Sequence, residues 1–139
     1  MINKVLTLFV LLLLSTSAVA ETTVVYGHNA SYANQKLELM TSLHQIFNSP
    51  ILVDSTIVND KGQFSFRFNL NEPKNVFISL GYYLIQFVAL PGDSINISLA
   101  PYRPLSKAEL YNPYFTPETF QIIPNSGKSL DVNTQLIRF

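Results

Sequence analysis

The tripeptide Gly92-Asp93-Ser94 is the stretch of this chain that most suggests covalent chemistry, because Gly-Asp-Ser carries the nucleophile in one class of serine esterases. A serine nucleophile needs a base to take its proton and a carboxylate to orient that base. In those esterases the partners follow near the C-terminus as Asp-x-x-His, and the serine lies between a strand and a helix. Here His28 and His44 both precede Ser94, and the residues after Ser94 alternate as a strand. We therefore interpret Ser94 as a turn residue and keep a Ser94 hydrolase as the less favoured alternative.

Other chemical signatures are weak. His28 and His44 are separated by 15 residues in a chain without cysteine, which is a poor basis for a transition-metal site. The segment Asn59-Asp60-Lys61-Gly62 lacks the alternating acidic ligands of a calcium loop. The aspartates are isolated in the sequence, which argues against the paired carboxylates of a glycosidase. We predict a protein that is not an enzyme, with no catalytic, metal-binding or cofactor-binding residues and no cofactor.

Residues 1–20 have the three-part layout of a secretory signal peptide. A start that carries Lys4 precedes an apolar run from Val5 to Leu14, and Ala18-Val19-Ala20 supplies small residues before Glu21. An apolar run of about 10 residues is half of the roughly 20 needed to span a bilayer. We expect cleavage after Ala20, no stable membrane anchor afterwards, and export to the periplasm, the cell surface or the medium.

The charge of the expected mature chain argues against nucleic acid as a partner. Without Lys4 it has eight basic residues against nine acidic ones, a formal net charge of minus one. Affinity for phosphate grows with the number of charges neutralised, so a nucleic-acid binder concentrates a basic excess on one face. The basic residues here are spread along the sequence: Lys36, Lys61, Arg67, Lys74, Arg103, Lys107, Lys128 and Arg138.

Apolar alternation predicts strands over residues 21–100. In Gln63–Leu70 the aromatic residues Phe64, Phe66 and Phe68 alternate with polar ones, which is typical of a strand with one face in the core. The further predicted strands are 22–28, 35–41, 51–58, 76–80, 83–90 and 95–99. About seven short strands with regular turn signals predict an antiparallel β-sandwich.

Two turns are predicted to form hairpins. A short polar loop that ends at Gly62 suits a hairpin in which this glycine has a positive φ. Pro91-Gly92 is the favoured central pair of a type II turn, and Asp93 and Ser94 can satisfy backbone donors there.

Residues 101–139 differ in composition from the rest. Five of the eight prolines fall here among tyrosines and phenylalanines, so we expect an extended strap packed by its aromatic side chains rather than a central strand. Ser129 is a candidate N-cap for a short helix with Leu130, Asn133, Leu136 and Ile137 on one side. Whether the chain ends there as a frayed tail or is the beginning of a longer protein stays open.

The turn and core patterns resemble a known family. They comprise Gly27, Leu37-Glu38-Leu39, Asp54-Ser55 with Val58 to Phe66, Pro73, and Leu90-Pro91-Gly92-Asp93-Ser94-Ile95-Asn96-Ile97. Together they resemble the N-terminal β-sandwich domain that precedes the thioredoxin-like domain in certain Gram-negative envelope thiol-disulfide oxidoreductases. The resemblance covers about residues 22–99 and implies a sandwich fold in the periplasm or at the surface. It brings no catalytic residues, because the redox work of that family belongs to a downstream Cys-x-x-Cys domain.

These observations predict an exported accessory or protein-interaction module. Its partner would be another envelope protein or a missing C-terminal region of its own, which could add a strand at an exposed sheet edge. A carbohydrate-binding module is the alternative, with tyrosines as the stacking face: Tyr26, Tyr32, Tyr82, Tyr83, Tyr102, Tyr111 and Tyr114.

Overall fold

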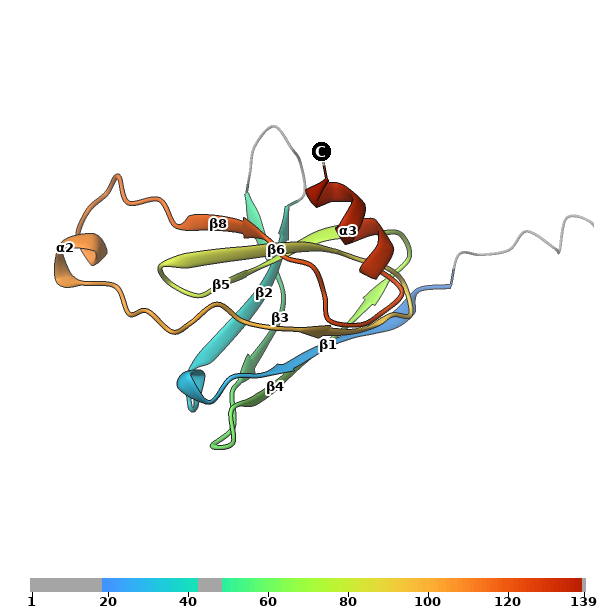
Figure 1. Cartoon of the computed structure of the whole chain (residues 1–139), viewed down its shortest axis with the longest axis horizontal. Coiled ribbons are helices and arrows are strands. Elements are labelled where there is room, and N and C mark those ends of the chain that lie inside the picture. Colours follow the sequence, from blue (N-terminus) through green and yellow to red (C-terminus); the bar gives the residue numbers. More distant parts are fainter. Residues whose placement is uncertain (1–18, 43–48, 139) are drawn as a thin grey trace, which may run out of the picture.

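The protein is an all-β sandwich of a three-stranded and a five-stranded sheet (Figure 1). The computed structural model describes residues 19–42 and 49–138. The predicted signal peptide, apart from its last two residues, and His44 lie outside the described residues. The strands, in chain order, are β1 (Glu21–His28), β2 (Lys36–Ser42), β3 (Pro50–Ile57), β4 (Gln63–Leu70), β5 (Lys74–Ser79), β6 (Tyr83–Ala89), β7 (Ser94–Ile97) and β8 (Glu118–Gln121).

The seven strands predicted from alternation are all present, with ends that agree to within two residues. The smaller sheet has the order β4-β1-β7, and the larger has the order β3-β2-β5-β6-β8. Inward side chains of the smaller sheet, such as Val25 and Phe66, share one buried core with Ile78 and Phe87 of the larger sheet. Burial of each such side chain contributes about 1.5 to 3 kcal/mol. The sandwich is therefore held by the apolar faces that the sequence alternation indicates.

The strap contains more regular structure than expected. It begins with an extended stretch, forms the short helix α2 (Lys107–Leu110), and returns as β8, an eighth strand at the edge of the larger sheet. Pro117 and Pro124 lie on either side of β8 and not within it, so no ladder donor is lost. The prediction that the strap contributes no central strand agrees with this edge position, but the strand at Glu118–Gln121 was not predicted.

The sandwich is also not wholly antiparallel. β7 pairs in parallel with β1, and β8 pairs in parallel with β6, whereas the other four pairings are antiparallel. A tight hairpin can join only antiparallel strands. β7 and β8 each follow a strand of the other sheet, so each can run parallel to its neighbour. The predicted antiparallel arrangement therefore holds for most of the sandwich and fails at these two strands.

The two predicted turns are corners between the sheets, not hairpins. Gly62 and Gly92 have the expected positive φ, at 82° and 65°. However, β3 and β4 on either side of Gly62 lie in different sheets, and so do β6 and β7 on either side of Gly92. The positive φ of each glycine was correctly predicted, but the strands that each turn joins pair with other strands, in different sheets.

A terminal helix, α3 (Leu130–Ile137), begins after Ser129 as predicted and packs beside β6. In Figure 1 it lies at one side of the sandwich, far from α2. Among residues 19–42 and 49–138, no helix is both long and apolar enough to cross a bilayer.

Candidate functional site

Ser94 and His28 are not brought together. In the parallel pairing of β1 with β7, Ser94 lies opposite Val24, and His28 is four residues farther along β1. At about 3.3 Å per residue, this offset corresponds to roughly 13 Å along the strands. His44 lies outside the described residues. The described residues therefore do not place a histidine beside Ser94 to act as its base.

Asp93 is a buried structural anchor. Its side chain is only 2% exposed, and its carboxylate accepts backbone N–H bonds from Ser94 at 2.7 Å, Lys128 at 2.7 Å and Ser129 at 2.8 Å. Ser129 occupies the predicted N-cap position, but the oxygen that accepts bonds there comes from Asp93. The predicted role of Asp93 in satisfying backbone donors is confirmed, and it also connects the corner before β7 to the start of α3.

Asn133 fixes α3 against the edge of the larger sheet. Its buried side-chain amide accepts a bond from the Val88 N–H at 2.7 Å and donates to the Val88 carbonyl at 2.9 Å. It also donates to the Ser129 carbonyl and accepts a bond from the Gln121 side chain. Sequence reasoning placed Asn133 on one side of the helix with Leu130, Leu136 and Ile137 but assigned it no role; in the structure Asn133 is buried, whereas Leu136 and Ile137 are exposed. The available signal was a polar residue among apolar ones on that side.

An arm, residues 101–117, projects from the sandwich between β7 and β8 (Figure 1). It has α2 at its far end, and three large side chains there face solvent. Leu110 is 63% exposed, Tyr111 is 80% exposed and Tyr114 is 89% exposed. These side chains bury little surface within the chain and are therefore free to contact another molecule.

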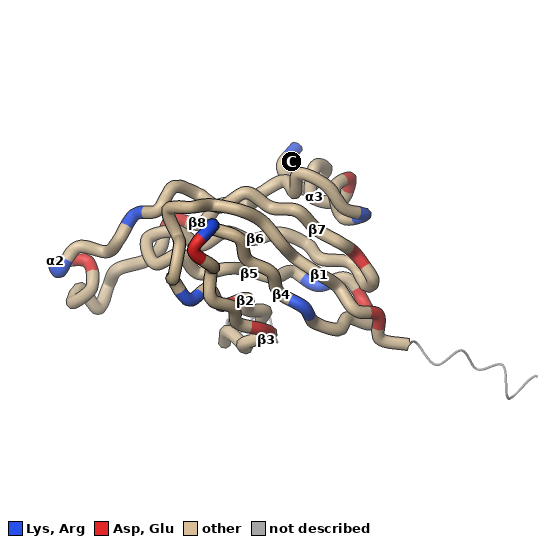
Figure 2. Tube along the Cα trace, turned by 90° about the horizontal axis from the view of Figure 1, so that it is seen from below, with Lys and Arg blue, Asp and Glu red and all other residues tan. Residues whose placement is uncertain are grey.

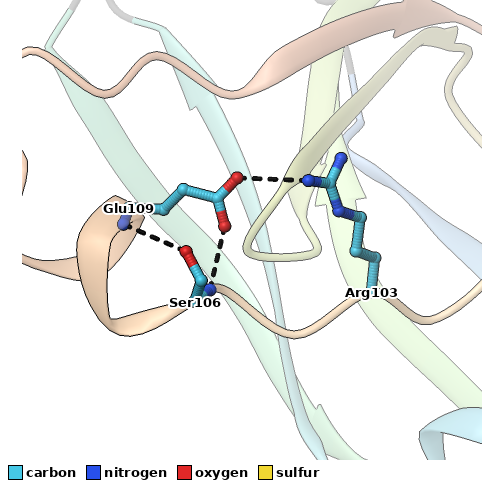
Figure 3. A network of polar contacts seen from close by, with 3 residues as sticks. All are labelled: Arg103, Ser106 and Glu109. Carbon is cyan, nitrogen blue, oxygen red and sulfur yellow. Dashed lines mark hydrogen bonds and ion pairs between the residues drawn. The ribbon is translucent and has the colours of Figure 1, made fainter.

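Polar contacts order the arm (Figure 3). The Ser106 N–H donates to the Glu109 carboxylate at 2.9 Å, and the Glu109 N–H donates to the Ser106 hydroxyl at 3.2 Å, which together form a capping box. Arg103 contacts the same carboxylate at 3.2 Å, and its guanidinium lies 3.3 Å from the centre of the Tyr82 ring. The pKa of Glu109 is lowered, chiefly by the Ser106 backbone N–H, with the Ser106 side chain and Arg103 adding to the effect.

Aromatic contacts hold the base of the arm. Tyr102 packs edge-on against Tyr32 at 5.2 Å between ring centres, and Phe115 lies 5.9 Å from Tyr82. The Tyr32 hydroxyl donates to the Ala100 carbonyl at 2.8 Å, and burial of this ring raises the pKa of Tyr32 to about 12. Packing by strap aromatics, as predicted, is therefore confirmed at the base of the arm, but the side chains at its far end are exposed.

A pocket of about 250 Å³ lies at the root of the arm, with Tyr32, Lys36, Tyr102 and Arg103 among the residues that line it. Its two cations already have partners within the chain. Lys36 bonds Glu38 at 2.7 Å, and Arg103 contacts both Glu109 and the Tyr82 ring. The pocket therefore offers aromatic surface more than free positive charge.

Over residues 19–42 and 49–138, charge is distributed without a basic face. Figure 2 shows the basic and acidic residues scattered along the described trace. Within the part of the chain that the structure describes, no group of three or more metal-ligating side chains is found.

Comparisons with protein-family models, curated proteins and solved structures give no match for this chain. The candidate site therefore rests on geometry, and the exposed end of the arm is the surface best suited to contact a partner.

Proposed function

We propose that this chain is an exported, non-enzymatic β-sandwich of the bacterial envelope that serves as an accessory or protein-interaction module. The observation that carries the proposal is the exposure of Leu110, Tyr111 and Tyr114 at the end of an ordered arm. Tyrosine is enriched at the centres of protein interfaces. An arm that is ordered before binding also loses less conformational entropy when a partner docks.

The partner is another envelope protein or, if the reading frame continues beyond the Phe139 codon, a following region of the same protein. The resemblance to the sandwich domain of envelope thiol-disulfide oxidoreductases implies a β-sandwich, and this chain has that fold. In that family the sandwich accompanies a separate catalytic domain. An accessory role beside a partner fits a chain whose exposed surface offers contact groups.

Site-specific crosslinking tests the proposal. A photoreactive phenylalanine analogue at position 114 should crosslink a discrete envelope protein in cells, whereas the same analogue at position 57 serves as the control. Ile57 is also exposed but lies on β3, outside the arm. The combined variant Leu110→Ser, Tyr111→Ser, Tyr114→Ser should lose the partner in a pull-down, and Leu52→Ser, Ile57→Ser should keep it. Equal capture by both variants would contradict the proposed surface.

Exposure of the Tyr111 and Tyr114 rings also favours a second candidate, a carbohydrate-binding module. Aromatic faces that project into solvent can stack on a sugar ring. A glycan array separates the two functions. A carbohydrate-binding module would bind a defined glycan, and the combined variant Tyr111→Ala, Tyr114→Ala would no longer bind it. The protein-interaction proposal expects an array without specific binding.

A further inference from the structure

The Asp54 carboxylate accepts hydrogen bonds from backbone N–H groups on two edge strands. One oxygen of its carboxylate accepts the Ser55 N–H at 2.8 Å on β3, and the other accepts the Arg67 N–H at 2.8 Å on β4. β3 and β4 are edge strands of the two sheets. A free N–H on an edge strand is a template for another chain, so one carboxylate blocks pairing at the middle of both edges.

The strap and α3 close two further positions. Asn96 of β7 donates to the Ser126 carbonyl at 3.2 Å and accepts the Asn125 N–H at 2.7 Å. Beyond the end of β8, the Asn133 amide occupies the N–H and the carbonyl of Val88 on β6. These contacts occupy backbone groups at which a partner strand would otherwise pair.

β8 presents an edge of a different kind. The Glu118 N–H donates to the Tyr82 carbonyl, and the Ile122 N–H donates to the Gln86 carbonyl, so both donors point toward β6. Backbone groups alternate in direction along a strand. The N–H and carbonyl groups of Thr119 and Gln121 therefore point away from β6, on the outer side of the sheet. Within the described residues, β8 is the edge strand at which we find no side chain or loop bonded to the outward backbone groups, in contrast to the contacts of Asp54 and Asn133.

We propose that β8 pairs with β8 of a second copy of this chain, antiparallel about a two-fold axis at Phe120. Thr119 would then lie opposite Gln121 of the second copy in a hydrogen-bonded pair, and Phe120 would lie opposite its own counterpart. The two five-stranded sheets would become one continuous sheet.

The self-complementary register favours a second copy as the occupant. In this register Glu118 lies opposite Ile122, so no like charges oppose each other on β8. The expected mature chain has a formal net charge of only minus one, so little net charge opposes self-association. Phe120 is 39% exposed and would gain an aromatic cross-strand partner, a favourable pair in antiparallel sheets.

A single cysteine tests this register, because the chain contains none. The two Phe120 positions would form a non-hydrogen-bonded pair with Cα atoms about 4.5 Å apart, which suits a disulfide. Phe120→Cys should therefore give a covalent dimer that a reductant reverses. Leu52→Cys, at an exposed position on the opposite edge strand, is the matched control and should stay monomeric. Equal crosslinking of both variants, or of neither, would overturn the proposal.

A second test removes the outward donor alone. Thr119→Pro deletes an N–H that points away from β6, whereas Thr119→Val keeps it. Sedimentation equilibrium from micromolar to millimolar concentration should give a reversible dimer for the parent chain and for Thr119→Val. Thr119→Pro should weaken the dimer at least tenfold, with an unchanged circular dichroism spectrum as the check on folding. A parent chain that stays monomeric at millimolar concentration, or a folded Thr119→Pro with the parent affinity, would refute pairing at β8.

Discussion

The side-chain amide of Asn133 forms hydrogen bonds with both backbone groups of Val88, as a neighbouring strand would. It accepts from the Val88 N–H at 2.7 Å and donates to the Val88 carbonyl at 2.9 Å. The pairing of β8 with β6 ends at Gln86, so this amide continues the edge contact where the strand stops. One helical side chain thereby satisfies two backbone groups of β6 and fixes the position of α3.

Replacement of Asn133 by alanine should destabilise the protein by about 2 to 4 kcal/mol, because it leaves both Val88 groups without their partner. Urea unfolding followed by circular dichroism measures this loss. Gln135→Ala, at an exposed position of the same helix, is the control and should change stability by less than about 0.5 kcal/mol. Equal effects of the two variants would mean that the amide contact contributes nothing.

Asp93→Asn should release the start of α3. Three backbone N–H groups point at the carboxylate, and an amide would turn an NH₂ toward one of them. We expect a loss of about 2 to 3 kcal/mol in the free energy of unfolding. Hydrogen exchange at Lys128 and Ser129 should become faster as well. Asp131→Asn, in the exposed first turn of α3, is the matched control, and unchanged exchange in Asp93→Asn would contradict the anchor.

Tyr32 makes stability depend on alkaline pH. Its pKa is raised from 10.0 to about 12 by burial, so the folded state favours the neutral phenol. The corresponding stability is complete below pH 10 and is lost as the pH rises from 10 to 12.

Tyr32→Phe removes both the phenol and its bond to the Ala100 carbonyl. The substitution should lower the free energy of unfolding by about 1 kcal/mol at pH 7. Between pH 9 and pH 11, however, the free energy of unfolding of the variant should fall less than that of the parent. Urea unfolding at pH 7, 9 and 11 gives the comparison. Tyr111→Phe, at an exposed position, should follow the parent curve. Parallel curves for Tyr32→Phe and the parent would rule out the role of the phenol.

Glu109 should make the order of the arm depend on acidic pH. Its pKa is lowered below the ordinary 4.5 by the Ser106 N–H, so the ionised form holds the contact. The contact is present above pH 4.5 and is lost as the pH falls through the lowered pKa. Amide NMR relaxation at Tyr111 and Tyr114 should report greater mobility there.

Glu109→Gln should reproduce this mobility at pH 7, because the amide cannot form the ion pair with Arg103. The sandwich should keep its stability, since the arm packs outside the core. Glu118→Gln, an exposed acid on β8, is the control. An arm in Glu109→Gln that is as ordered as in the parent would show that the aromatic base alone orders it.

The sequence by itself determined the elements whose causes are local. The alternation of Phe64, Phe66 and Phe68 follows from the two-residue period of a strand, and it produced the strand and its buried face. Gly62 and Gly92 have a positive φ, a conformation that a Cβ atom disfavours. Glycine is therefore the expected residue at such positions, and both turns could be predicted from residue type. The start of α3 after Ser129 was placed correctly from residue type, although the Ser129 side chain makes no capping bond and Asp93 supplies the acceptor there.

Only the tertiary structure decided which segments meet. A hairpin and a corner between two sheets need the same turn residues. Which of the two forms depends on how the apolar faces of the strands pack across the whole core. The roles of Asp93 and Asn133 depend on backbone groups 35 and 45 residues away, which no local pattern specifies. The exposure of Tyr111 and Tyr114 likewise arises because α2 ends the arm beyond the reach of the core, whereas Tyr102 lies near enough to pack against Tyr32.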